Sequence, residues 1–435
     1  MDLEGLRRSL LDARDARAAL LGGVASRPGR TTLVFLSLNV PGPDKMTPRL
    51  GWVFARARVA LSAELPGSSL LAEGRDALGP YALLKVPITA ANAKVACVRL
   101  EESLPFGRLV DLDVLAPGGA QVDRASLGLP PRRCLVCDRA AVECIRTARH
   151  SSAELSSAAL AVARSPLVAL ARALADGARA ELDLTPKPGL VDRLDSGSHP
   201  DLSHASMRRS IDTLPAYYQD LIELADGEPL DLAACVSAGV RAEERALAAA
   251  GSNAHRGYIF LSGLLLLAAA ADQTGTTAGW RAETRAVARR LPGEATGAEP
   301  SHGEQARRGY RVEGVLGEAA AGLPSVFDHG LPALDDALAR GLSPETAQHY
   351  AMAVLMTRVE DTTALHRCGP AGLARLKEDG ASLAALIEEG GDHLRRLRAL
   401  NDDYRAMRLT MGGVADCLAL TLAVRTTVAL SGVPG

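Results

Sequence analysis

Residues 185–199 read Thr-Pro-Lys-Pro-Gly-Leu-Val-Asp-Arg-Leu-Asp-Ser-Gly-Ser-His, and this stretch decides how the second half of the chain is interpreted. Its two prolines exclude it from a helix interior or a central strand, and Gly189 permits a tight turn. The predicted loop concentrates charged groups, namely Lys187, Asp192, Arg193, Asp195 and His199. A stiff loop of this kind suits a nucleotide phosphate together with its metal ion. The alternative interpretation is a surface linker with solvated charges.

The composition of the chain points away from several classes of protein. The chain has 435 residues, a formal net charge of −2 and only 3% aromatic residues. This length predicts two domains. The near-neutral charge argues against a nucleic-acid-binding protein or a polybasic membrane-surface protein. With so few aromatics the core must be built from Leu, Val and Ala, which favours closely packed helices over an all-β sandwich.

The distribution of apolar residues and cysteines predicts a soluble cytoplasmic protein. The first residues, Met-Asp-Leu-Glu-Gly-Leu-Arg-Arg, contain no apolar signal core. The longest apolar run, over residues 258–271, is too short to span a bilayer. Seven cysteines, an odd number, suit reduced thiols or ligands better than a disulfide framework. We therefore expect neither a membrane nor a nucleic acid as a partner.

The character of the sequence changes between about residues 151 and 165. Before this boundary, a helix is predicted over residues 1–25 and a strand over 31–40, while four segments suit strands or strand–helix mixtures: 52–61, 81–86, 93–100 and 108–115. After it, Ala/Leu-rich segments predict helices over 232–250, 258–272, 346–359, 372–389 and 414–430, with a loop over 291–306. The sequence predicts an α+β domain with a mixed sheet at residues 1–155 and an all-α domain at 165–435.

The sharpest local signal in the first domain is the run from Gly107 to Leu115. In a strand, Asp111 and Asp113 lie on one face while the intervening apolar residues face the core. Two adjacent carboxylates repel each other, and a divalent cation resolves the repulsion and supports phosphoryl transfer. Gly107 and Arg108 before this Asp-x-Asp pair resemble the corresponding turn of polymerase-β-like nucleotidyltransferases. The alternative is an edge strand with a solvated acidic face.

A cysteine- and arginine-rich segment follows at residues 132–150. Cys134 and Cys137, with Cys144 and His150, supply four zinc ligands. In the competing interpretation the cysteines are small buried apolar residues, and the arginines bind phosphate: Arg132, Arg133, Arg146 and Arg149. The sequence favours the second interpretation, because several arginines beside a metal-bearing strand suit a reaction that releases pyrophosphate.

The first domain resembles holo-citrate lyase synthase, also called apo-citrate lyase phosphoribosyl-dephospho-CoA transferase. The resemblance covers roughly residues 10–155 and rests on the runs 36–45, 107–114 and 133–150. It implies transfer of a phosphoribosyl-dephospho-CoA group to a serine of the apo acyl carrier subunit of citrate lyase, with release of pyrophosphate. Asp111 and Asp113 map onto the implied metal positions. Arg108, Arg133 and Arg146 are the predicted phosphate-binding residues.

The second domain resembles triphosphoribosyl-dephospho-CoA synthase from about residue 170 onward. The resemblance rests on the 185–199 loop with Asp201, on Gly239 and Glu243, on the run 251–260, and on later matches at 301–303, 317–319, 361–362 and 412–416. It implies that ATP is joined to dephospho-CoA with release of adenine. The attacked atom is then the ribose carbon that bears the base, so nearby carboxylates stabilise developing positive charge.

The resemblance assigns roles to individual residues of the second domain. Asp192 or His199 is the expected general base. Lys187, Arg193 and Arg256, with Asn253 and His255, are expected to bind substrate and its phosphates. Asp201, Glu243, Asp361 and Asp416 are the expected Mg²⁺ ligands. Structural alternatives exist for several of them: Glu243 in a solvated ion-pair face, and Asn253, His255, Asp361 and Asp416 at helix ends.

The two resemblances together predict a bifunctional maturation enzyme of citrate lyase, with ATP and dephospho-CoA as substrates and Mg²⁺ as cofactor. A zinc ion is the less favoured addition. One alternative is the same chemistry serving malonate decarboxylase. Another is a non-catalytic scaffold that binds nucleotide and carrier protein, because the sequence departs from the family at Ala254 and Leu316, where Thr and Arg are usual, and has Arg256 and Thr363 where Lys and Asn are frequent.

Overall fold

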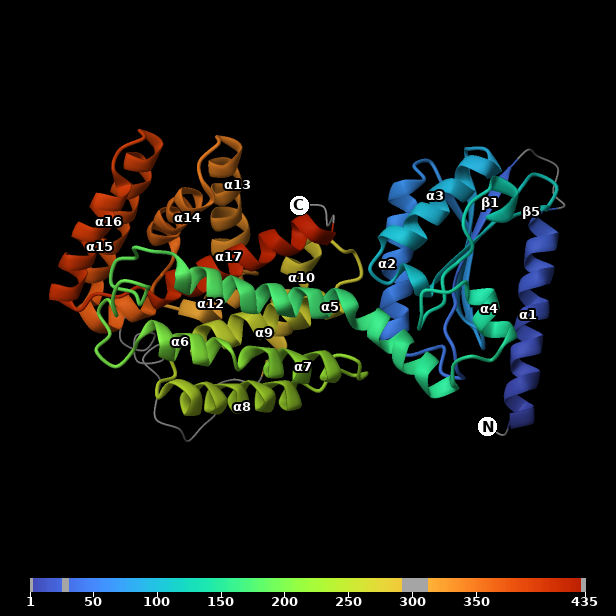
Figure 1. Ribbon diagram of the computed structural model, residues 1–435, viewed down its shortest axis with the longest axis horizontal. Helices are drawn as coiled ribbons and strands as arrows, with labels where there is room; N and C mark the ends of the chain where they lie inside the picture. Colours follow the sequence, from blue (N-terminus) through green and yellow to red (C-terminus); the bar gives the residue numbers. More distant parts are fainter. Residues whose placement is uncertain (1–2, 26–30, 292–311, 432–435) are drawn as a thin grey trace. The chain divides into compact units, whose positions relative to one another are not determined.

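The computed structural model describes residues 3–25, 31–291 and 312–431. The chain divides into two compact units, residues 1–166 with 273–275 and residues 167–272 with 276–435 (Figure 1). The first unit contains a five-stranded sheet, and the second consists of helices. Residues 292–306 of the expected loop lie outside the described residues.

The sheet of the first unit has the strand order β2-β3-β1-β4-β5. Its strands are β1 (Thr32–Leu38), β2 (Ser69–Asp76), β3 (Gly79–Val86), β4 (Val110–Leu115) and β5 (Gln121–Val122). Every pair is antiparallel, so the prediction of a mixed sheet was wrong. Apolar alternation does not encode strand direction, whereas the two-residue turn at 77–78 reverses the chain between β2 and β3.

Helices cover both faces of this sheet (Figure 1). The helices of this unit include α1 (Leu3–Ala25), α2 (Pro48–Glu64), α3 (Ala90–Ser103) and the short α4 (Ala141–Arg146). α2 and α3 pack on the face that carries Val34, Leu36 and Leu112, while the end of α1 packs on Phe35 and Leu83. Burial on both faces explains why every residue of β1 is buried.

Two segments that suited strands or strand–helix mixtures are helical. Residues 52–61 lie in α2 and residues 93–100 in α3. Each helix begins after a threonine whose hydroxyl accepts a hydrogen bond from the first turn, from Leu50 N to Thr47 and from Asn92 N to Thr89. A short apolar run is compatible with the spacing of a helix and with that of a strand. The threonine caps are therefore the signal that identifies these two segments as helices.

The second unit is built from twelve described helices. They are α5 (Ser152–Asp183, which begins in the first unit), α6 (His204–Ile211), α7 (Leu214–Leu224), α8 (Leu232–Ala250), α9 (Arg256–Ala271), α10 (Thr277–Arg290), α12 (Gly314–Ala320), α13 (Leu331–Ala339), α14 (Pro344–Arg358), α15 (Thr362–Glu388), α16 (His393–Met407) and α17 (Gly412–Ser431), with a π-helical turn η3 (Ser325–Gly330) before α13. The five predicted helices correspond to α8, α9, α14, α17 and the part of α15 after its kink at Gly369 and Pro370.

The centre of the second unit is formed by α9 and α17. α9 is apolar around its whole circumference, and nearly all of its residues from Tyr258 to Ala269 are buried, as expected of a helix surrounded by other helices. By length and composition alone, α5 and α17 are apolar enough to cross a membrane. Residues of both helices nevertheless pack into the core of this unit, including Leu170, Leu174, Leu418 and Leu420. Each of the two helices thus contributes apolar residues to this core.

Candidate active sites

The 185–199 loop is packed into the second unit. Residues 186–192 are all buried. The backbone N–H of Gly189 donates to Asn401 of α16 at 3.0 Å, and the Ser198 hydroxyl donates to the Leu409 carbonyl at 2.6 Å. A Cβ at Gly189, which has a φ of +69°, would overlap the Leu409 carbonyl. The interpretation as a solvated linker was therefore wrong.

Within the loop, the carboxylate of Asp192 accepts hydrogen bonds from the loop's own backbone. Its Oδ1 accepts hydrogen bonds from Leu194 N at 2.7 Å and Asp195 N at 3.2 Å, and its Oδ2 accepts one from Lys187 N at 2.8 Å. The side chain is 3% exposed. Its position therefore fixes the conformation of the loop.

His199 lies where the loop meets α15 and the start of α17. Its Nε2 is 2.8 Å from the Thr410 hydroxyl, and its Nδ1 is 3.2 Å from the guanidinium of Arg367. Burial and the Arg367 charge lower the pKa of His199 to about 4. The imidazole is therefore neutral near pH 7. Asp201 is exposed beside it, and Arg193 is exposed and paired with Asp183 at 2.9 Å.

Lys187 forms a buried ion pair that sequence reasoning missed. Its Nζ donates to the Glu181 carboxylate at 2.6 Å and to the Glu181 carbonyl at 2.6 Å, and the side chains are 1% and 8% exposed. Burial raises the pKa of Glu181, while the Lys187 ammonium opposes this rise. Nothing in the sequence distinguishes Glu181 from a solvated residue near a helix end, because the pairing depends on how the loop folds back.

Asp416, in the first turn of α17, has an exceptional electrostatic environment. Burial raises its pKa well above the ordinary value, and the negative charges of Asp361 and Glu181 raise it further. Among the described residues we find neither a hydrogen-bond partner nor an ion-pair partner for its carboxylate. A Cβ at Gly257, near the start of α9, would overlap this carboxylate. The glycine therefore allows Asp416 to lie against the beginning of α9.

Asp361 acts as the N-terminal cap of α15. Its Oδ1 accepts from the backbone of Thr363 and Ala364 at 2.9 Å, and its Oδ2 accepts from Val414 N at 3.0 Å. Burial raises the pKa of Asp361, and these hydrogen bonds oppose the rise. The residue thereby joins the beginnings of α15 and α17, where backbone N–H groups favour anions.

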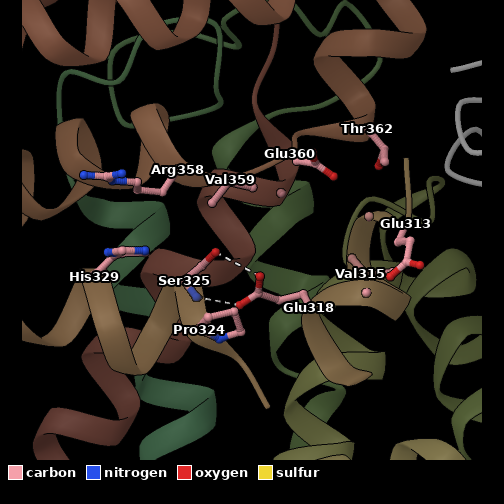
Figure 2. A pocket seen from close by; sticks show the side chains of 13 residues that line it. Glu313, Val315, Glu318, Pro324, Ser325, His329, Arg358, Val359, Glu360 and Thr362 are labelled. Atoms are coloured by element: carbon pink, nitrogen blue, oxygen red, sulfur yellow. Dashed lines mark hydrogen bonds between the residues drawn. The ribbon is translucent and has the colours of Figure 1, made fainter. Parts of the chain in front are cut away.

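A pocket of about 350 Å³ opens beside these helix starts (Figure 2). It is lined by Glu313, Gly314, Val315, Gly317, Glu318, Pro324, Ser325, His329, Arg358, Val359, Glu360, Thr362 and Gly413. Ser325 donates from its backbone N–H at 2.8 Å and from its hydroxyl at 2.9 Å to the two oxygens of Glu318. Burial raises the pKa of Glu318, and these two bonds oppose the rise. Asp416 lies one helical turn after Gly413 of the pocket wall.

A second cluster joins α8 to the start of α9. The amide of Asn253 donates to Glu243 at 2.9 Å, and the guanidinium of Arg256 lies 3.4 Å from the same carboxylate. The adjacent arginines of α8, Arg241 and Arg245, pair instead with Asp220. Glu243 therefore forms a partly exposed ion pair, as in the alternative interpretation, but with Arg256 at the start of α9 and not with the neighbouring arginines of α8. Neither Glu243 nor Asp201 lines the pocket.

His255 precedes α9, and its side chain forms a hydrogen bond in the interior of the second unit. Its Nδ1 is 2.8 Å from the Ser210 hydroxyl, and it makes no side-chain capping bond to α9. Burial and the nearby Lys187 charge lower the pKa of His255 to about 4. Leu316, one of the departures from the family pattern, is 40% exposed between the pocket-lining residues Val315 and Gly317.

In the first unit, β4 has the predicted alternation. Val110, Leu112 and Val114 are buried, while Asp111 and Asp113 are partly exposed on the opposite face. Opposite them on β1 lie Ser37 and Phe35. Burial raises the pKa of Asp113, and the charge of Asp111 raises it further.

Arg132 connects the cysteine segment to this pair of carboxylates. Its Nη1 donates to Asp111 at 2.9 Å, and its Nη2 donates to the carbonyls of Arg108 and Val110. Asp113 accepts a hydrogen bond from Gln121 at 2.7 Å. Arg133 and Arg146 are exposed. Arg139, Arg146 and Arg149 line a smaller pocket of about 190 Å³ with Glu143, Cys144 and Thr147.

Residues 168–432 of the chain match the family described as ATP:dephospho-CoA triphosphoribosyl transferase. Residues 6–164 match the family described as apo-citrate lyase phosphoribosyl-dephospho-CoA transferase. A probable 2-(5''-triphosphoribosyl)-3'-dephosphocoenzyme-A synthase of Stutzerimonas stutzeri is 37% identical over 257 residues, which cover 56% of this chain and 86% of the relative.

Two relatives match over nearly their whole length. The protein CitXG of Leuconostoc mesenteroides subsp. cremoris is 27% identical over 449 residues, covering 95% of each chain. The protein CitXG of Haemophilus influenzae is 29% identical over 464 residues, covering 95% of this chain and 94% of the relative. The chain therefore belongs to the ATP:dephospho-CoA triphosphoribosyl transferase family, and it carries an apo-citrate lyase phosphoribosyl-dephospho-CoA transferase domain in front of the family domain.

Proposed function

We propose that the helical domain joins ATP to dephospho-CoA with release of adenine, and that the first domain transfers the phosphoribosyl-dephospho-CoA group to a serine of an apo acyl carrier subunit with release of pyrophosphate. The observation that carries this proposal is the presence of both family domains in one chain, as in the CitXG relatives. The protein is accordingly a bifunctional transferase of the citrate lyase prosthetic group. Its first-domain match favours citrate lyase over malonate decarboxylase as the client.

The pocket beside α15 and α17 supports the adenine-releasing step. Displacement of a base from a ribose carbon builds positive charge on the sugar, which fixed carboxylates stabilise. Glu318 is suited to this role, because two hydrogen bonds from Ser325 hold its carboxylate in one orientation. Arg358 in the pocket wall provides a cation for phosphate groups.

Asp416 is the residue best suited to hold Mg²⁺. Oxygen ligands are those that Mg²⁺ prefers, and a cation would stabilise a carboxylate now surrounded by like charge. Bound there, Mg²⁺ would neutralise part of the triphosphate charge. Asp361 lies near Asp416 and adds negative charge to the site. Its own oxygens cap α15 and bind Val414 N. Lys187, Asp192 and His255 form buried hydrogen bonds within the helical domain and thereby hold the 185–199 loop and the start of α9 in place.

The paired aspartates of β4 support the transfer step of the first domain. Asp111 and Asp113 lie side by side on one face, and the pKa of Asp113 is raised by burial and by its neighbour, which suits a divalent cation at this position. Arg132 reaches the same group and offers a cation for the departing pyrophosphate. None of the seven cysteines, all of which lie among the described residues, forms a disulfide, which suits the reducing cytoplasm where we expect the protein to act.

One assay tests the proposal. Purified protein is incubated with Mg²⁺, ATP and dephospho-CoA, and free adenine is measured by chromatography. The apo acyl carrier subunit is then added, and its mass is measured. We expect adenine release without the carrier, followed by a mass increase of the carrier. Absence of adenine release from folded protein would support the scaffold alternative instead.

A further inference from the structure

The segment from residue 131 to residue 150 lacks an apolar core of its own. Within this described stretch only Cys134 and Cys144 are buried. Its larger apolar side chains include Val136, Val142 and Ile145, which are 38%, 54% and 78% exposed. A segment of this size without a core usually depends on a metal ion or disulfides for its conformation. The two buried residues are cysteines, whose thiolates are common metal ligands.

The backbone of the segment brings four potential ligands to one point. A short hairpin is closed by the bridge between Arg133 and Ala140 and by hydrogen bonds from Cys134 N to the Arg139 carbonyl at 2.7 Å and from Ala141 N to the Arg132 carbonyl at 2.8 Å. This hairpin presents Cys134 and Cys137, and the following helix α4 presents Cys144.

A left-handed residue then returns the chain to the same point. Ala148 has a φ of 45°, and Arg149 N donates to the Cys144 carbonyl at 3.0 Å. This turn places His150 beside the three cysteines. The ligand atoms of Cys134, Cys137, Cys144 and His150 all lie within 4.8 Å of one another. Spacing along the sequence alone does not show that the chain turns back at Ala148.

The chemistry of the four groups suits zinc. The Nε2 of His150 is buried and, within the described part of the chain, has no hydrogen-bond partner. A buried imidazole nitrogen is thus left without a protein partner among these residues, and a metal ion would provide one. Cys137 Sγ and Cys144 Sγ are 3.5 Å apart. A disulfide between these two would leave Cys134 and His150 without a role, whereas a tetrahedral ion uses all four.

The charges around the cluster are also compatible. Three thiolates and one Zn²⁺ carry a net charge of about −1. The segment contains five arginines, at 132, 133, 139, 146 and 149, against two carboxylates, Asp138 and Glu143, and three of the arginines (139, 146 and 149) line a pocket with Cys144. Phosphate binding by the arginines is compatible with a metal at the cysteines. The sequence-based preference for the cysteines as buried apolar residues is not, and the geometry of the four ligands favours the metal.

We propose that Cys134, Cys137, Cys144 and His150 bind one zinc ion that has a structural role. Four protein ligands leave no open position for a reacting water or substrate. The ion would fix the hairpin from which Arg132 reaches Asp111 at 2.9 Å. It would thereby position this arginine relative to the paired aspartates of β4.

The first test is the metal content of the full-length protein, purified under reducing conditions without chelators or a metal-affinity tag. We expect about one zinc per chain, measured by mass spectrometry of the elements. Replacement by Co²⁺ should give the intense visible absorption of tetrahedral cobalt bound to thiolates. Folded protein that contains neither zinc nor bound cobalt would overturn the proposal. Iron in place of zinc would overturn the identity of the metal.

Variants provide the second test. Cys137→Ser and His150→Ala should each lose most of the zinc, while the control Cys368→Ser, outside the cluster, should retain it. If the protein has the proposed function, loss of zinc should slow carrier loading and leave adenine release unchanged. Zinc retained by both cluster variants would exclude this site. Loss of zinc with normal carrier loading would exclude the positioning role of the ion.

Discussion

At the scale of single residues, Asp416 lowers the stability of the folded domain when it is ionised, and it is also the residue proposed to bind Mg²⁺. Its pKa is raised by burial and by the charges of Asp361 and Glu181. A carboxyl group with a raised folded-state pKa contributes stability below its unfolded-state pKa and loses it as pH rises through the folded-state value. An ionised Asp416 without a cation therefore destabilises the helical domain. Such a residue is expected where a ligand or metal recovers the energy.

The variant Asp416→Asn should separate these two effects. It keeps the size of the side chain and removes the charge. We expect adenine release to fall by about 100-fold or more, because a lost metal ligand is worth several kcal/mol in the barrier. The melting temperature in the absence of Mg²⁺ should rise at pH 8, by roughly 2–4 °C for each kcal/mol recovered.

The parent protein should also lose stability as pH rises, more steeply than the variant, because only the parent has the Asp416 carboxyl to ionise. Scanning calorimetry over a pH series measures this difference. Asp231→Asn is the matched control, since Asp231 caps exposed positions of α8 and Asn caps a helix equally well. An Asp416→Asn variant with parental adenine release would remove this residue from the metal site.

At the scale of elements, the 185–199 loop is held by its own carboxylate. Asp192 accepts three backbone N–H groups, and Asn offers one oxygen in place of two. A buried donor left without its acceptor costs about 1–3 kcal/mol. We therefore expect Asp192→Asn to lower the free energy of unfolding by this amount and to reduce adenine release. Urea denaturation and the adenine assay on one preparation measure both.

Arg193→Gln is the comparison variant for this loop, because Arg193 is exposed. If this residue binds phosphate, the KM for ATP should rise while stability is unchanged. Undiminished stability of Asp192→Asn, together with lost activity, would favour the catalytic role predicted for Asp192 from the sequence over its role in shaping the loop.

The sequence was most informative where the apolar residues followed a single spacing, either that of a helix or that of a strand. The helix over 232–250 and the alternation around Asp111 and Asp113 have the predicted form. The segments 52–61 and 93–100 were ambiguous, because short apolar runs suit both periods and the deciding caps lie outside the runs. The Glu181–Lys187 pair depends on a loop folding back onto its preceding helix, and local patterns do not encode such a contact.

At the scale of the whole molecule, the two candidate sites belong to different compact units. Asp111 and Asp113 lie in the first unit, while Asp416 and the 350 Å³ pocket lie in the second. Each unit has its own apolar core. Removal of the charges at one site is therefore expected to leave the other site folded and chemically competent.

The double variant Asp111→Asn, Asp113→Asn tests this independence. The substitution preserves side-chain size and removes the charges that would hold a metal ion, so stabilisation of the departing pyrophosphate, worth several kcal/mol, is lost. The variant should release adenine at the parental rate, accumulate the triphosphoribosyl intermediate and fail to load the carrier. The carrier is analysed by mass spectrometry with the intermediate supplied directly, so that only the second step is measured. Asp123→Asn, at an exposed turn of the same unit, is the control. Near-parental loading by the double variant would mean that the paired aspartates are a solvated strand face, and the transfer site would have to be sought elsewhere in the first unit.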